Sequence, residues 1–205
     1  MCGIFDLNLI EGTIGSAECI LVKCGIGKVN AARVTQILID KFDISYIINV
    51  GSAGGINDEV RYGDIVIGKY LVQHDFDTTA FGHEKGFISN IGIKLESDKE
   101  LIKKCEEAIN QVIANDYKII VGTIATGDIF CTSVKMKEKI RQKFDADCVE
   151  MEGAAIAQVC FLSNVPFIAV RSISDTPNEK NHLDFNKYIQ LASKRCADFI
   201  EVLYK

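Results

Sequence analysis

The amino-acid sequence predicts a single α/β domain over residues 1–205, in which helices cover both faces of a mixed or mainly parallel β-sheet. Three observations predict this class. Apolar runs of strand length alternate with segments whose apolar residues recur at helical spacing. Most of the runs are apolar throughout, which is typical of strands buried on both faces. No internal repeat or linker divides the 205 residues, a length that suits one core.

The first half of the chain predicts three strands, one helix and a long loop. Residues 19–27 form an apolar run that ends in glycines and predict the first strand, and helical periodicity over 27–42 predicts the first helix. The apolar runs 46–55 and 64–75 predict two further strands. Residues 76–90 show no period and predict a long loop, a feature that is often functional in compact domains.

The second half continues the alternation. A polar amphipathic helix is expected over 98–114, a strand over 117–128 and a helix over 134–143. The acidic segment DCVEME then leads into a helix over 153–164 and a strand over 165–175. The last helix is the clearest element, because its apolar residues form one stripe at i, i+3, i+4 and i+7 spacing: Phe185, Ile189, Ala192, Cys196, Phe199, Ile200 and Leu203.

Composition excludes several classes of partner. The net charge of -5, without a basic patch, argues against a nucleic-acid partner. No run approaches the ~18 apolar residues of a membrane span, and the start MCGIFDLNLIEG lacks the features of a signal peptide. We therefore expect a cytoplasmic protein with no membrane partner.

The cysteines and histidines do not predict a metal site. The eight cysteines include no C-x-x-C pair, so reduced and mostly buried thiols are expected. His74, His83 and His182 lie far apart and have no ligand spacing. Neither a metal nor another cofactor is expected.

Polar or glycine-rich clusters follow four of the predicted strands. They are GSAGG (51–55), ATGDIFCTS (125–133), EMEGA (150–154) and RSISDT (171–176). Because ligands of α/β folds bind at the carboxyl ends of strands, one shared site is expected. Each cluster taken alone also has a structural interpretation. GSAGG and GIGK suit turns, Asp175 suits a turn cap, and an acid pair suits a helix N-terminus.

The acid pair Glu150 and Glu152 has a functional interpretation as well. A carboxylate accepts two hydrogen bonds and a cis-diol offers two donors, so one of the pair suits a ribose. The other would accept backbone amides or pair with Arg171, whose guanidinium needs a carboxylate on so apolar a strand. Met151 would supply an apolar wall, and Asp175 suits a general acid at the rim of the site.

The clusters occur in the order found in one family. The matching segments are CGIGK (24–28), NVGSAGG (49–55), GDIV (63–66), TAFGHE (79–84), TGDIF (126–130), VEMEGAAIAQVC (149–160), NVPFIAVRSISD (164–175) and HLDF (182–185). From about residue 4 to the C-terminus, the chain resembles the 5'-methylthioadenosine/S-adenosylhomocysteine nucleosidases of the nucleoside phosphorylase fold. The resemblance implies three layers, with a mixed central sheet between helices. It also implies hydrolysis of the bond between adenine and ribose, with an adenine nucleoside as the small-molecule partner.

The resemblance assigns roles to individual residues. Asp175 would protonate N7 of the purine, Ser174 would hold Asp175, and Glu152 would bind the ribose hydroxyls. Phe81 would reach the site of a partner subunit, which implies a homodimer. The remaining implied substrate contacts are Ser52, Ala53 and Gly54 beside the sugar, Met151 on the sugar, Phe130 and the backbone at Cys131 on the purine, Ile26 and Phe185 at the 5'-alkylthio group, and Glu150 and Arg171 beneath the site.

One departure from the family lies at the start of the chain. Family members begin with a strand like GIIGAMEEE, whose glutamate activates the attacking water, whereas residues 1–15 align with the hairpin that follows that strand. Glu11 is expected at the hairpin turn and Glu18 at the start of the next strand, and neither is an obvious substitute. General-base catalysis is worth ~10²–10⁴-fold, so we expect slow turnover and a sheet without that strand.

Other functions remain open. One is a degenerate relative that binds adenine nucleosides without turning them over. A purine nucleoside phosphorylase would place arginines around a phosphate, and the GSAGG and GIGK loops carry none nearby. Futalosine hydrolysis is closer in chemistry, but TAFGHE (79–84) favours the thioadenosine substrates.

Overall fold

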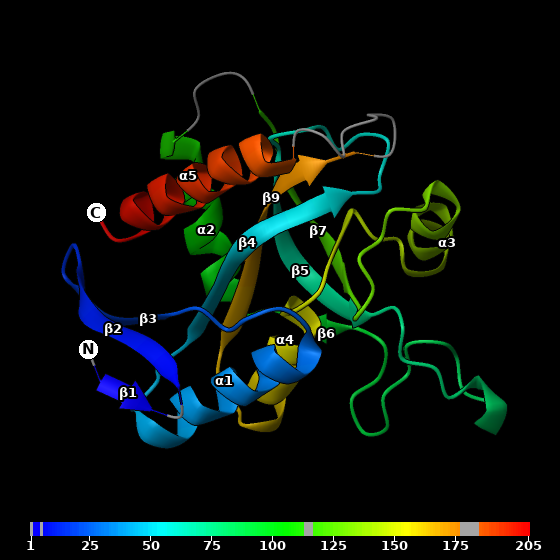
Figure 1. Ribbon diagram of the computed structural model, residues 1–205, viewed down its shortest axis with the longest axis horizontal. Coiled ribbons are helices and arrows are strands. Elements are labelled where there is room, and N and C mark those ends of the chain that lie inside the picture. The colour runs from blue at the N-terminus through cyan, green and yellow to red at the C-terminus, as the bar shows by residue number, and fades with distance from the viewer. Residues whose placement is uncertain (1, 5, 113–116, 177–184) are drawn as a thin grey trace.

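The computed structural model describes residues 2–4, 6–112, 117–176 and 185–205 (Figure 1). The main strands and helices expected from the sequence are confirmed, with ends that differ by a few residues. In chain order the elements are β1 (Cys2–Ile4), β2 (Leu7–Ile14), β3 (Ala17–Val22), α1 (Lys28–Lys41), β4 (Ile47–Gly55), β5 (Ile65–Gln73), the 3-10 turn η1 (Thr79–Phe81), β6 (Leu95–Glu96), α2 (Lys99–Val112), β7 (Ile119–Thr126), α3 (Val134–Phe144), β8 (Cys148–Glu150), α4 (Gly153–Leu162), β9 (Phe167–Asp175) and α5 (Phe185–Leu203).

The central sheet is mixed and closes on itself. Its order is β6-β5-β7-β8-β4-β9, and a further pairing joins β5 to β9. The strands form two parallel sets, β5 with β7 and β8, and β4 with β9. The sets run in opposite directions, because β4 pairs antiparallel with β8 and β5 pairs antiparallel with β9. The expected mixed sheet is therefore confirmed, and its closure is a feature that the sequence pattern did not predict.

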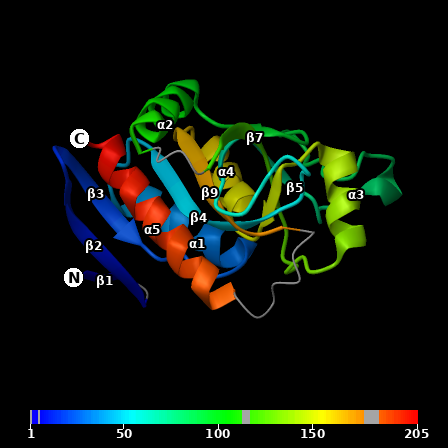
Figure 2. The ribbon, with the colours of Figure 1, turned by 90° about the horizontal axis from the view of Figure 1, so that it is seen from above.

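Helices cover the two faces of this sheet. Helices α1 and α4 lie together on one face, while α2 and α5 lie together on the other (Figures 1 and 2). Successive side chains of β5 point to opposite faces of the sheet, so this strand contributes to the core on both faces. Val66 packs in the core beneath α4, and its neighbours Ile65 and Ile67 pack in the core beneath α2 and α5. All three side chains are fully or nearly fully buried, which explains why this strand is apolar at successive positions.

The N-terminal hairpin forms a separate sheet of β1, β2 and β3. It packs on α1 through Leu9, which is fully buried with Val34 of the helix. The expected turn at Glu11 is wrong. Glu11 lies inside β2 opposite Ile20, and the turn forms at Gly15, whose φ of 58° suits a glycine.

Within the described residues, β4 pairs with β9 alone over Ile47–Ala53. The other edge of β4 meets β8 only at Gly54 and Gly55. No described strand of the hairpin pairs with β4. Within the described residues, one edge of β4 is therefore unpaired over Ile47–Ala53.

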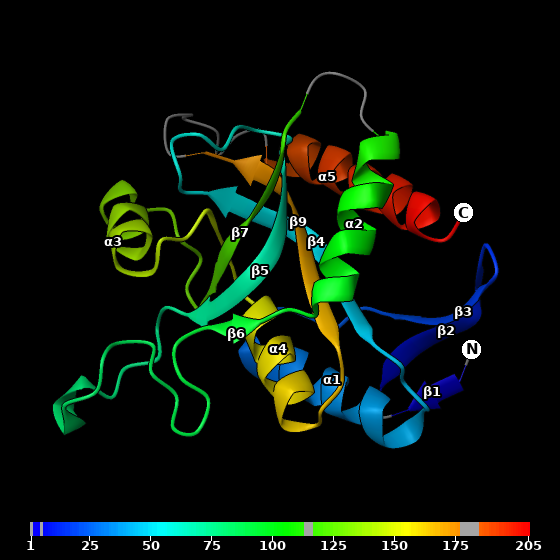
Figure 3. The ribbon, with the colours of Figure 1, turned by 180° about the vertical axis from the view of Figure 1, so that it is seen from behind.

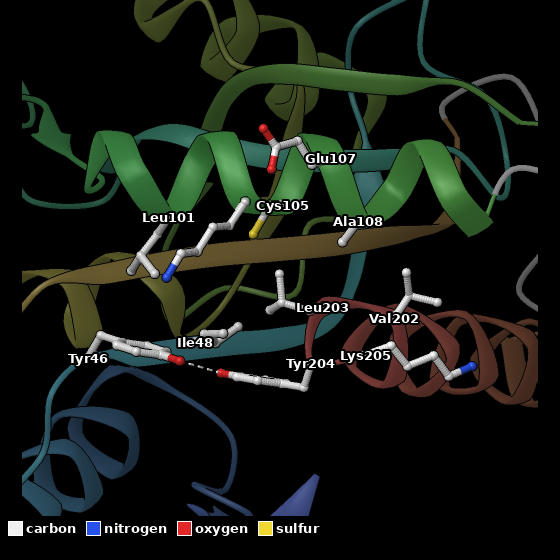
Figure 4. A pocket seen from close by; sticks show the side chains of 11 residues that line it. Tyr46, Ile48, Leu101, Cys105, Glu107, Ala108, Val202, Leu203, Tyr204 and Lys205 are labelled. Atoms are coloured by element: carbon white, nitrogen blue, oxygen red, sulfur yellow. Dashed lines mark hydrogen bonds between the residues drawn. The ribbon is translucent and has the colours of Figure 1, made fainter. Parts of the chain in front are cut away.

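A hollow lies between α2, β4 and α5, away from the carboxyl ends of the strands (Figure 4). The hydroxyls of Tyr46 and Tyr204 are hydrogen-bonded beside it, 2.8 Å apart. Its lining is mostly apolar and includes none of the candidate site residues: Tyr46, Ile48, Leu101, Lys104, Cys105, Glu107, Ala108, Val202, Leu203, Tyr204 and Lys205. It therefore contributes nothing to a site at the strand ends.

The cysteines whose side chains are described are free thiols, and five of them are buried. Burial raises the pKa of Cys105 and of Cys160 to about 12, so both stay protonated at neutral pH. Over the same residues, no group of three or more His, Cys, Asp or Glu side chains has the arrangement of a metal site. Among the described helices, none has the length and apolarity needed to cross a bilayer.

Candidate active site

The carboxyl ends of four strands come together, as the clusters after them predict. Gly54 of β4 pairs with Asp175 of β9 on one side and with Val149 of β8 on the other. Glu150, the last residue of β8, pairs with Thr126, the last residue of β7. Because β4 and β8 run towards each other and overlap only at their ends, both sets of parallel strands contribute side chains to this one place.

Glu150 and Arg171 form a buried ion pair at the base of the site. Their side chains are each 2% exposed, and Arg171 Nη2 lies 2.7 Å from Glu150 Oε2. Arg171 also donates to the carbonyl oxygens of Asn49 and Val170, both at 3.1 Å. The expectation that this arginine pairs with a carboxylate is confirmed.

Glu150 also anchors the start of α4. Its Oε2 accepts the backbone N–H groups of Glu152 and Gly153 at 2.9 and 2.7 Å, and its Oε1 accepts the Thr126 hydroxyl. Burial raises the pKa of Glu150, but the Arg171 charge and these hydrogen bonds outweigh it and lower the pKa below its ordinary value. Glu150 therefore uses both oxygens within the protein, which favours the structural role over direct contact with substrate.

Glu152, the second acid of the pair, faces a different loop. It precedes the first residue of α4, and its Oε1 accepts the backbone N–H of Gly27 at 2.8 Å. Burial, with a smaller effect of the Glu150 charge, raises the pKa of Glu152 above its ordinary value. Glu150 thus anchors the start of α4, whereas Glu152 contacts the loop after β3.

The loop after β3 is tied to the ends of β5 and β7 by a polar network. Lys28 Nζ donates to Asp75 Oδ1 at 2.7 Å, and the Lys28 backbone N–H donates to Asp128 Oδ1 at 2.8 Å. The Asp128 backbone N–H in turn donates to Asp75 Oδ2 at 2.9 Å. From sequence, GIGK (25–28) was more simply interpreted as a structural turn. These contacts instead join the segment to the ends of β5 and β7 at the edge of the site.

Asp175 has a polar partner on each carboxyl oxygen. Oδ1 accepts the Ser174 hydroxyl at 3.1 Å, as expected for a serine that holds the acid, and Oδ2 accepts Lys137 Nζ at 2.8 Å. Ser174 Oγ also lies 3.3 Å from the carbonyl oxygen of Ala53. A Cβ at Gly54 would lie 3.1 Å from the carboxyl group, a contact so tight that Asp175 would have to shift by a few tenths of an ångström.

Lys137 is the residue of this site that sequence reasoning missed. It lies on the buried face of α3 with Ile140 and Phe144, at i, i+3 and i+7. A signal was present, because a lysine at a core-facing helical position is unusual unless it is paired.

The other residues implied at the substrate differ in how exposed they are. Cys131 and Ala53 are buried, and Ser52 and Met151 are half-buried at the strand ends. The side chain of Phe185, the first residue of α5, lies outside the described part of the chain. The most exposed members are Phe130 at 60%, Ile26 at 73% and Phe81 at 83%.

Phe81 lies away from the strand ends. It belongs to η1, within the segment between β5 and β6 that extends from the body of the molecule (Figures 1 and 3). Nothing within its own chain brings it to the site.

Comparison with known proteins places the chain in a class. The family model described as the phosphorylase superfamily matches residues 6–204, so the protein is a member of that superfamily. The 5'-methylthioadenosine/S-adenosylhomocysteine nucleosidase of Geobacillus sp. (strain WCH70) is 41% identical over 198 residues, which are 96% of this chain and 84% of the relative. The chain therefore belongs to the 5'-methylthioadenosine/S-adenosylhomocysteine nucleosidase family.

Solved structures agree. The nucleosidase of this name from Colwellia psychrerythraea 34H, in complex with adenine, has a TM-score of 0.92 and 33% identity, covering 99% of this chain and 84% of that one. A futalosine hydrolase of Helicobacter pylori strain 26695 has a TM-score of 0.91 and 32% identity, covering 98% and 85%. The expected three-layer fold of the nucleoside phosphorylase type is confirmed.

Proposed function

We propose that the protein hydrolyses the N-glycosidic bond of 5'-methylthioadenosine and S-adenosylhomocysteine, releasing adenine and a 5'-thioribose. Family membership and the adenine bound in the Colwellia relative support this substrate class. The observation that carries the proposal is the arrangement at the strand ends. An acid with a partner on each oxygen, Asp175, stands at the same edge as a half-buried carboxylate, Glu152.

Asp175 acts on the leaving group. Cleavage of the bond leaves its electron pair on adenine, so a proton delivered to purine N7 makes the base a better leaving group. The carboxyl side chain is 32% exposed and within reach of a ligand. Ser174, which is 3% exposed, holds it from behind, while Phe130 stacks on the purine and the backbone at Cys131 reads its edge.

Glu152 acts on the sugar. Its carboxylate accepts hydrogen bonds from the two ribose hydroxyls and places negative charge near a ribose that becomes positive as the bond breaks. Met151 and Ser52 contact the same sugar, and Ile26 covers the 5'-alkylthio group. Glu150 and Arg171 fix the start of α4 beneath them.

We further propose that the protein acts as a homodimer in which Phe81 of one protomer covers the site of the other. Its 83% exposure on a projecting segment supports this, because an isolated chain gains nothing from such an aromatic side chain. A cytoplasmic location stays a prediction from the sequence.

Futalosine is the second candidate substrate. The similarity to a futalosine hydrolase is as high in TM-score as that to many nucleosidases, so the fold does not separate the two activities. The names of the curated relatives favour the thioadenosine substrates. An assay with futalosine beside methylthioadenosine compares them directly.

The proposal is tested by Asp175→Asn, which keeps the shape of the side chain and removes its proton. We expect the wild type to release adenine from methylthioadenosine and the variant to lose about 10²–10⁴-fold in rate, the usual contribution of general acid catalysis. Calorimetry should still detect methylthioadenosine binding to the variant. Asp40→Asn, an exposed control on α1, should match the wild type. Equal adenine release by wild type and Asp175→Asn would remove Asp175 from the mechanism.

A further inference from the structure

Lys137 is buried beside the proposed proton donor. The residue is 5% exposed, and its side chain reaches from the core face of α3 to place Nζ 2.8 Å from Asp175 Oδ2. Burying an ammonium group is costly unless a charged partner compensates. Nothing about α3 requires a lysine here, because its neighbours on this face, Ile140 and Phe144, are apolar and pack in the core. We therefore attribute the presence of a lysine at this position to its ion pair with Asp175.

The pairing decides which oxygen of Asp175 carries a proton. An ammonium group has three donors and no acceptor, so the oxygen that faces Lys137 must remain unprotonated. Oδ1 faces Ser174, whose hydroxyl both donates and accepts. When Asp175 is ionised, Ser174 donates to Oδ1. When Oδ1 carries the proton, Ser174 is able to donate to the carbonyl oxygen of Ala53, 3.3 Å away.

Among the residues that the structure describes, Lys137 is the cation paired with Asp175. Cys131, just before α3, is buried close to both groups. Burial raises the pKa of the Cys131 thiol, with Lys137 opposing and Asp175 adding to the effect, so the thiol is neutral at pH 7. Because the Lys137 side chain is only 6% exposed, solvent screens its charge little.

We propose that Lys137 is a positioning residue for the proton donor, which confines the transferable proton to Asp175 Oδ1 and stabilises the carboxylate left after transfer. This inference rests on the proposed function. The proton passes from Oδ1 to purine N7 while the electrons of the C–N bond move to the base. Asp175 becomes a carboxylate, Lys137 keeps its three protons, and a proton from the attacking water later restores the acid.

The test compares three substitutions on α3. Lys137→Met keeps the apolar stem and removes the charge. We expect kcat for adenine release from methylthioadenosine to fall at least tenfold, with KM changed less than about threefold. Lys137→Arg restores a cation and should recover most of kcat. Lys139→Met, at an exposed position of the same helix, should match the wild type. A wild-type kcat in Lys137→Met overturns the proposal, as does a loss that appears only in KM.

A double variant separates action through Asp175 from a general structural effect. If Lys137 acts through Asp175, adding Lys137→Met to Asp175→Asn lowers the rate no further. Losses that multiply overturn the proposal. If Lys137→Met fails to fold, Lys137→Gln takes its place in both comparisons, with urea unfolding as the check. A wild type that releases no adenine overturns the proposed function itself. An active wild type, an inactive Asp175→Asn and a fully active Lys137→Met overturn only the role of Lys137.

Discussion

At the scale of single residues, the two glutamates of the site differ because of what surrounds them. Glu150 lies beside a guanidinium and two backbone N–H groups and has a lowered pKa, whereas burial raises that of Glu152. Removing one partner of a buried pair costs about 3–5 kcal/mol, while an exposed pair contributes about 0–1 kcal/mol. The stability of the site therefore depends on the buried ion pair between Glu150 and Arg171.

We predict that Glu150→Gln lowers the free energy of unfolding at pH 7 by about 3–5 kcal/mol, because it leaves the Arg171 charge buried without a partner. Urea denaturation measures the change. Arg141→Gln is the matched control, since its ion pair with Asp58 is exposed. That substitution should cost less than about 1 kcal/mol.

We also predict that the stability lost in Glu150→Gln depends on pH. A carboxyl group whose pKa is lowered by folding contributes stability above its unfolded pKa, about 4.3 for glutamate. That contribution disappears as the pH falls through the lower, folded value. The difference in stability between wild type and Glu150→Gln should therefore be constant near neutral pH and shrink below about pH 4. The pairing would be contradicted if the stability difference between wild type and Glu150→Gln were as large below about pH 4 as it is near neutral pH.

At the scale of elements, the sequence predicted most strands and helices because apolar periodicity depends on neighbours close in the chain. Strand β5 and helix α5 are examples. The closure of the sheet through β5 and β9 was not predicted, because it depends on pairing between residues such as Ile65 and Ser172, more than a hundred positions apart. The hairpin turn was misplaced at Glu11 because Gly12, a turn residue by type, lies within a strand.

The residues of the site were likewise predicted only in part from the sequence. Asp175, Ser174 and Glu152 were found from short motifs at strand ends, and the structure brings them to one edge. Lys137 was missed because its partner, Asp175, is 38 positions away in the sequence and only the fold brings the two side chains together. The absence of the family's water-activating glutamate, with the slow turnover expected from it, stays a prediction. Glu11 and Glu18 both lie in the hairpin sheet, far from the strand ends (Figures 1 and 2).

At the scale of the whole molecule, several large apolar side chains are exposed, some in the loops at the site and one, Phe81, on the projecting segment. Ile26, Phe130 and Phe81 are each at least 60% exposed, and three further apolar side chains nearby in sequence are also exposed: Val29, Ile129 and Val134. In the proposed homodimer, a second copy of the chain would cover these side chains and receive the projecting segment that carries Phe81.

We predict that light scattering finds a mass of two chains, and that Phe81→Ala keeps this mass but raises KM for methylthioadenosine about tenfold. The loss of one aromatic contact to the ligand is of this order. Phe161→Ala, another exposed phenylalanine, is the control and should leave KM unchanged. A monomer with full activity would exclude the shared site.

The most direct measurement is adenine release from methylthioadenosine by the unaltered chain, with and without phosphate, and with the sugar product identified by mass spectrometry. Hydrolysis predicts equal amounts of adenine and free 5-methylthioribose in phosphate-free buffer, with no change when phosphate is added. Release that requires phosphate and yields a sugar 1-phosphate would contradict water as the nucleophile. Binding of methylthioadenosine without release would contradict the assignment of catalysis to this site.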